Sequence, residues 1–78
     1  MKTTRYFEAT RVRPDRAQIR DAWILRVVEH PEYQSVQRDG RVRRWARIPE
    51  AGNKYLRVVL LPDLETVHNA FFDRNFAP

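Results

Sequence analysis

The chain has 78 residues, 42% of them apolar and 12% aromatic, which predicts one small globular domain spanning residues 1–78. The absence of cysteine excludes disulfides and thiolate chemistry, and no apolar run approaches the length of a membrane span. A net charge of +5 favours a polyanionic partner. We expect a cytoplasmic protein with no membrane partner.

The N-terminal third predicts one strand followed by one helix. Arg5–Thr10 alternates weakly and indicates a short strand. Arg13-Pro14-Asp15 has the composition of a first helical turn, and the helix should run through Val28 and stop near His30, because Pro31 disfavours helical geometry before it.

The second half of this predicted helix, Ala22–Val28, is apolar nearly all round. Two explanations remain open. Either the N-terminal strand and Phe76 cover its second side, or that side docks a partner or another copy of the chain through Ile24, Leu25 or Val28.

The next segment predicts a β-hairpin rich in arginine. Tyr33–Arg38 and Arg41–Ile48 flank Asp39-Gly40, a sequence typical of a type I′ turn. From Arg38 to Arg57 there are seven basic and two acidic residues, a net charge of +5 that equals the surplus of the whole chain.

Within that second strand, Arg41, Arg43, Trp45 and Arg47 share one face, and Arg44 lies on the other. Arginine and tryptophan together can combine phosphate contacts with base stacking. The alternative is that Trp45 is a core residue with arginine stems packed around it. The candidate nucleic-acid-binding residues are Arg41, Arg43, Arg44, Trp45 and Arg47.

A second hairpin is predicted from Tyr55–Leu61 and Glu65–Phe72, joined by a turn at Leu61–Leu64 with Pro62 in its second position. This turn would pair Leu60 with Glu65, Val58 with Val67 and Arg57 with His68. Alternation then gives one face for the core, comprising Leu56, Val58, Leu60, Val67 and Phe71. The other face carries Tyr55, Arg57, Thr66, His68 and Arg74, mixed with Val59, Ala70 and Phe72.

The predicted fold class is α+β, with the order β-α-β-β-β-β. We expect the last four strands to form an antiparallel meander, and the single N-terminal helix to pack on one face of that sheet.

Several chemistries lack the residues that they need. Two histidines, no cysteine and no spaced carboxylates give no metal site, and two isolated glycines give no phosphate loop, so we expect no cofactor. Ser35 stands alone, without the surroundings of a nucleophile. Metal-independent RNA cleavage remains, because His, Tyr and Arg can share proton transfer and charge stabilisation. The catalytic candidates are Tyr55, Arg57, His68 and Arg74. For His68 the alternative is a structural role, and Asp73 can instead pair with Arg74 and hold the tail.

The chain resembles the RelE-like toxin superfamily, and BrnT-like toxins within it. The likeness lies in a basic, cysteine-free chain with a glycine-turn hairpin, the strand Tyr55–Leu61, and the run from Val67 to Arg74 in which a basic residue precedes apolar ones and an arginine. It implies a translation-inhibiting ribonuclease neutralised by an antitoxin protein, with His68 and Arg74 near the active-site strand and Arg57 beside them. Trp45, the dense arginine strand and the absence of a C-terminal helix depart from the family pattern.

The first functional expectation is therefore a toxin-like protein that acts on RNA rather than DNA, as a metal-independent ribonuclease. One alternative is a basic nucleic-acid-binding module without catalysis. The other is an interaction domain whose apolar helix face and arginine strand dock an acidic partner protein.

Overall fold

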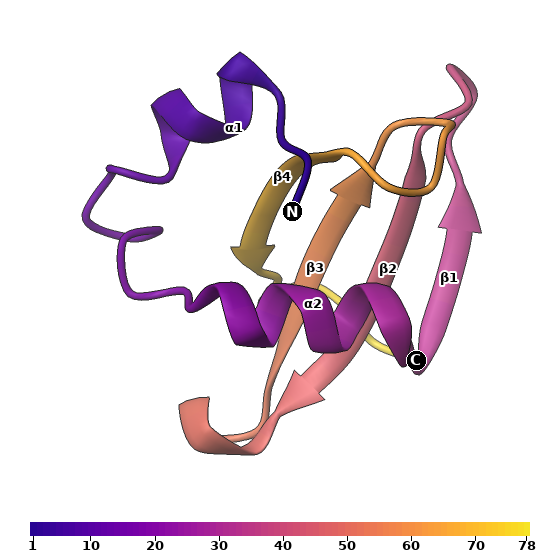
Figure 1. The fold of residues 1–78 in the computed structure, drawn as a ribbon. Helices are drawn as coiled ribbons and strands as arrows, with labels where there is room; N and C mark the ends of the chain where they lie inside the picture. The colour runs from indigo at the N-terminus through magenta and orange to yellow at the C-terminus, as the bar shows by residue number, and fades with distance from the viewer.

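The computed structural model describes residues 1–78, and it shows two helices and four strands in an α+β arrangement (Figure 1). The elements in chain order are α1 (Arg5–Thr10), α2 (Asp21–Glu29), β1 (Tyr33–Val36), β2 (Val42–Ile48), the 3₁₀ turn η1 (Pro49–Ala51), β3 (Lys54–Leu60) and β4 (Val67–Phe72). Neither helix has the length and apolar character needed to cross a bilayer.

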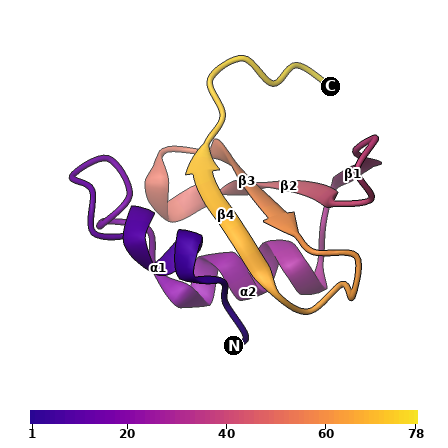
Figure 2. The same ribbon diagram turned by 90° about the horizontal axis from the view of Figure 1, so that it is seen from above.

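The strands form one antiparallel sheet in the order β1-β2-β3-β4, so the predicted meander is confirmed. Both helices lie on the same side of this sheet, and the C-terminal tail rises on the opposite side (Figure 2). The core sits between the helices and the sheet. Its largest fully buried side chains are those of Ile24, Val27, Ile48, Leu56, Val58, Leu60 and Val67.

The N-terminal strand was predicted wrongly, because Arg5–Thr10 is the helix α1. Thr4 caps it by accepting a hydrogen bond from the amide of Phe7 to its side-chain oxygen. Phe7 and Thr10, three residues apart, are the positions that become buried, which is helical spacing. The only strand-like pairing near this end is a parallel bridge between Thr3 and Val67. The element order is therefore α-α-β-β-β-β.

The second helix is shorter than predicted and begins at Asp21, not near Pro14. Arg13 opens a turn, since its carbonyl accepts the amides of both Arg16 and Ala17, but Arg20 has an extended backbone with ψ of 144°. A helix cannot continue through that residue, so α2 starts after it. The predicted end near His30 is confirmed, because the His30 amide closes the last turn on Arg26.

The apolar character of α2 is explained by the sheet beneath it. Ile24 and Val27 are buried, and Val28 packs partly against the same core, whereas Leu25 is 39% exposed. Ile24 therefore does not belong to a docking surface. Phe76 does not cover the helix either, because it lies on the other side of the sheet, against Trp45.

The first hairpin was predicted correctly, but its turn type was not. A type I′ turn needs positive φ at both central residues. Only Gly40 has it in this loop, with φ of 91°. The amide of Gly40 donates to the carbonyl of Gln37, and the amide of Gln37 donates to that of Arg41. The connection is therefore longer than two residues, with the glycine at its end.

In the second hairpin the predicted turn is present, since the amide of Leu64 donates to the carbonyl of Leu61 at 2.9 Å. The predicted pairing is wrong. Asp63 accepts the amides of Glu65 and Thr66, which keeps both residues in the loop, and β4 then has a bulge opposite Val59 and Leu60. The observed pairs are Leu60 with Val67, Val59 with Asn69, Val58 with Ala70, Arg57 with Phe71 and Leu56 with Phe72.

Because of this register, three side chains of β4 lie on the face of the sheet opposite to the predicted one. Phe71 lies beside Arg57, away from the helices, and not in the core as predicted. Ala70 is buried, and Phe72 packs against the core next to Trp23. A single extra residue in a strand moves the residues beyond it to the opposite face.

Truncation of two neighbouring residues on α2 tests this packing. Ile24→Ala removes a fully buried side chain and should lower the free energy of unfolding by about 2–4 kcal/mol. Leu25→Ala, the matched control, should change it by less than about 1 kcal/mol. Urea titration measures both values. Equal losses would show that the helix presents a different face to the sheet.

Candidate nucleic-acid interface

The sheet face that points away from the helices carries most of the predicted functional residues, and we call it the open face. It is built from alternate residues of the four strands, which the pairing brings into cross-strand rows. Tyr33, Trp45, Arg57 and Phe71 form one row, and Ser35, Arg43, Val59 and Asn69 form the next.

Trp45 is the buried centre of this face. Its ring is stacked on Phe76, with the ring centroids 4.5 Å apart and the planes 15° from parallel. Its indole N–H donates a hydrogen bond to the carboxylate of Asp73 at 3.0 Å. The tail is thus anchored through Phe76. Because Phe76 and the guanidinium groups of Arg43 and Arg57 cover Trp45, it is a packed residue in this structure, and its ring is not open to a base.

Two arginines are held against the aromatic rings of the open face. The guanidinium carbon of Arg57 lies 5.7 Å from the centre of the Trp45 ring and 5.1 Å from that of Phe71, and that of Arg43 lies 5.8 Å from Trp45. Arg57 also has an ion pair with Asp73 at 3.6 Å. Such contacts fix the direction of a guanidinium without using all of its donors.

The Nε atoms of Arg43 and Arg57 are buried and have no hydrogen-bond partner. Burial and the charge of Arg43 lower the pKa of Arg57, which Asp73 offsets only in part. Buried donors without an acceptor are uncommon in folded proteins. An anion placed on this face would relieve the repulsion between the two cations.

Next to these arginines is a cavity of about 340 Å³ that contains His68. Its lining includes Tyr6, Gln37, Arg41, Arg57, His68 and Asn69. The His68 ring stacks on Tyr6 at 4.9 Å, and its Nδ1 lies 3.0 Å from the hydroxyl oxygen of Thr4. Burial and the nearby Arg41 lower the pKa of His68. At neutral pH this histidine is therefore a neutral, oriented base among cations.

The four catalytic candidates do not converge. Arg57 and His68 line the same cavity, whereas Tyr55 and Arg74 line a larger one at the other end of β3 and β4. Asp73 pairs with Arg57 and Trp45, not with Arg74. Of the four catalytic candidates, only Arg57 and His68 therefore lie together at the smaller cavity.

The candidate nucleic-acid-binding residues also separate. Arg41 and Arg43 belong to the open face, and Arg47 lies at its edge, exposed and paired with Glu32 at 3.5 Å. Arg44 is on the helix side, where it donates to the carbonyl of Val28 and to the side chain of Gln34, each at 2.7 Å. Arg44 therefore holds the end of α2 against the sheet.

Three residues of this region were not found from the sequence. Tyr6 reaches His68 because its segment is a helix, not the predicted strand. Asn69 reaches the cavity through the bulge in β4, and Arg16 reaches Asn69 from the connection between the helices, with a hydrogen bond of 2.6 Å. Only the positive charge of Arg16 was visible in the sequence.

Nowhere do three histidine, cysteine or acidic side chains come together in a way that could hold a metal ion. No family model, no curated protein and no solved structure matches the chain.

The lowered pKa of His68 makes stability depend on pH. The unfolded chain binds a proton at His68 more readily than the folded chain does. The stability that neutral His68 gives to the folded chain is therefore present above the ordinary histidine pKa of about 6.5 and is lost as the pH falls below it. We expect the melting temperature of the protein to fall between pH 7.5 and pH 5.5, and His68→Gln to reduce that fall. His30→Gln, at an exposed histidine, is the control and should leave it unchanged. An equal fall in the protein and in His68→Gln would contradict the assigned environment.

Proposed function

We propose that the protein binds the phosphate backbone of single-stranded nucleic acid, RNA in preference to DNA, on the open face of its sheet. The observation that carries this proposal is the pair of guanidinium groups of Arg43 and Arg57, which both lie over the Trp45 ring on one face with only Asp73 to balance their charge. Arg41 adds a third cation at the adjoining cavity.

Packing prepares these arginines for an anion. Their guanidinium groups lie over aromatic rings, so less side-chain freedom is lost when a phosphate binds than with a free surface lysine. Hydrogen bonds between arginine and phosphate are also stronger than neutral ones. The open face therefore offers fixed charge, which a merely solvated basic surface does not.

Two exposed tyrosines supply rings for bases in place of the covered Trp45. Tyr6 and Tyr33 are 47% and 42% exposed and lie at opposite sides of the open face. Unpaired bases stack on such rings with little dependence on sequence. The side-chain amides of Gln37 and Asn69 line the cavity and can bond a 2′-hydroxyl group, which supports the preference for RNA.

A second candidate function, metal-independent RNA cleavage, is favoured by one observation: a neutral histidine shares the cavity with Arg41 and Arg57. His68 would accept the 2′-hydroxyl proton as the 2′ oxygen forms its bond to phosphorus. The bond from phosphorus to the 5′ oxygen then breaks, and that oxygen takes a proton from water. Arg57 would stabilise the charged intermediate. This candidate agrees with the resemblance to RelE-like toxins and with an antitoxin as partner.

Binding is tested with a fluorescently labelled oligouridylate at several salt concentrations. We expect Arg43→Gln and Arg57→Gln each to weaken binding about ten-fold, because each removes a charged hydrogen bond. Each should also reduce the slope of log affinity against log salt by about 0.7. Arg13→Gln, at an exposed arginine between the helices, is the matched control. The proposal fails if Arg13→Gln weakens binding as much as the other two.

Cleavage is tested on the same RNA in the presence of EDTA. We expect cutting to persist with EDTA and to fall about 10²–10⁴-fold in His68→Ala, because a general base has been removed. His30→Ala should cut like the unaltered protein. Cutting that His68→Ala retains would remove the catalytic assignment, and binding without cutting would leave the first function alone.

A further inference from the structure

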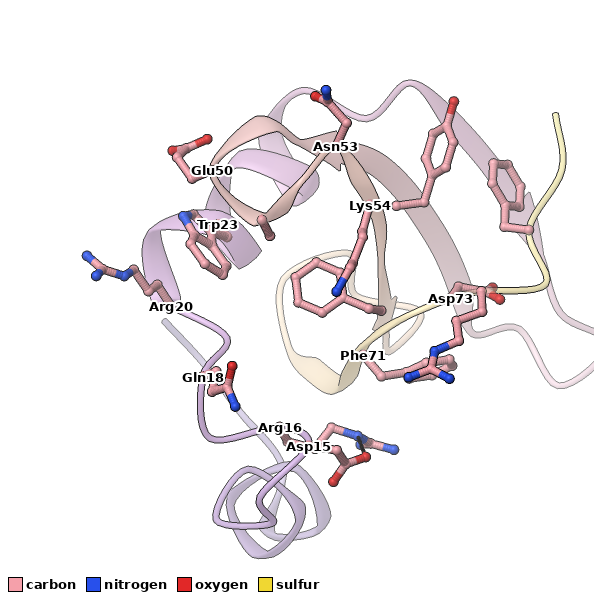
Figure 3. A pocket seen from close by; sticks show the side chains of 15 residues that line it. Asp15, Arg16, Gln18, Arg20, Trp23, Glu50, Asn53, Lys54, Phe71 and Asp73 are labelled. Carbon is pink, nitrogen blue, oxygen red and sulfur yellow. Dashed lines mark ion pairs between the residues drawn. The ribbon is translucent and has the colours of Figure 1, made fainter.

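A second recess lies along the outer edge of β4, with a volume of about 1330 Å³. Figure 3 shows Gln18, Arg20 and Trp23 on one wall and Lys54 and Phe71 on the other, with open space between the walls. The first wall is the connection between the helices and the start of α2. The second is the end of β4 with the neighbouring start of β3.

The backbone of β4 is unpaired where it faces this recess. At its start, Val67 bonds with Lys2 and Thr4, but that pairing ends where α1 begins. The amide of Asp73 donates to the carbonyl of Tyr55 on β3. Because antiparallel residues turn alternately toward and away from their partner strand, the N–H and C=O of Phe72 point outward.

Two residues earlier, the outward amide of Ala70 is satisfied by the side chain of Asn69 at 3.0 Å, and Ala70 itself is buried beside Arg16 and α1, outside this recess. The free N–H and C=O of Phe72 therefore form the open part of the strand edge. An unpaired edge of this kind accepts an added strand.

The side chains around the edge give it a positive charge. Arg20 lies over Trp23 at 5.8 Å and Lys54 lies over Phe72 at 5.9 Å, and neither has an ion pair; Arg74 has none either. The acidic residues of the lining are already paired: Asp15 with Arg16, Glu50 with Arg26 and Asp73 with Arg57.

We propose that this recess binds an extended, acidic segment of a partner protein, which adds to the edge of β4 as a further strand. Its backbone would bond with Phe72, its apolar side chains would contact Trp23 and Phe72, and its acidic side chains would meet the three free cations. A peptide fits this site better than RNA does, because the free groups of Phe72 are a backbone donor and acceptor at the edge of a strand. The proposal does not depend on the function of the open face.

The probe is a labelled octapeptide of alternating glutamate and valine. We expect Arg20→Glu combined with Arg74→Glu to weaken its binding by about ten-fold or more, because two attractions become repulsions. Arg13→Glu combined with Arg38→Glu changes the net charge equally at exposed positions outside the recess and should alter binding less than about two-fold. Hydrogen exchange at the Phe72 amide should slow when the peptide is added.

Two further peptides separate strand addition from charge attraction alone. The same octapeptide is methylated on the backbone nitrogens of either its odd-numbered or its even-numbered residues, and at least one of these two versions should bind weakly. A version with lysine in place of glutamate should not bind. Equal binding of both methylated peptides, equal weakening in both double variants, an unchanged Phe72 amide, or displacement of the peptide by oligouridylate would each overturn the proposal.

Discussion

The helices of this protein cover one face of the sheet, and the other face has to be closed by its own side chains and the tail. Trp45 cannot stay buried unless something lies above it, and Phe76, Asp73 and the guanidinium groups of Arg43 and Arg57 do so. This requirement explains why charged residues stand at central positions of a sheet. The arginines are partly packing residues, and their charge is fixed in place as a result.

The same constraint gives the open face its chemical character. The guanidinium groups of Arg43 and Arg57 lie over aromatic rings, and one carboxylate, that of Asp73, is too little to balance their charge. His68 enters this environment through the bulge in β4, and its pKa is lowered there by burial and by Arg41. The proposed phosphate recognition and the proposed proton transfer would both use this one arrangement, whereas the edge of β4 is a separate surface with backbone groups and apolar walls.

The sequence predicted the second half of the fold well, because Gly40 and Pro62 mark turns and the runs between them alternate. It failed in the first twenty residues, where Tyr6 and Phe7 fit a strand pattern as readily as a helix and the deciding feature is the cap at Thr4. The open-face positions of Arg43 and Arg57 follow from alternation within single strands. Phe71, Asn69 and Tyr6 could not be placed, because the bulge and the path of the N-terminal segment depend on tertiary contacts.

The most direct test of the account is to map a bound oligouridylate on the isotopically labelled protein by amide chemical-shift changes. If the open face is the binding surface, the largest changes fall on Arg41, Arg43 and Arg57 and on the cavity residues His68 and Asn69, while the exposed side of α2 is unaffected. Changes confined to the recess along β4, or spread evenly over exposed arginines such as Arg13 and Arg38, would contradict it.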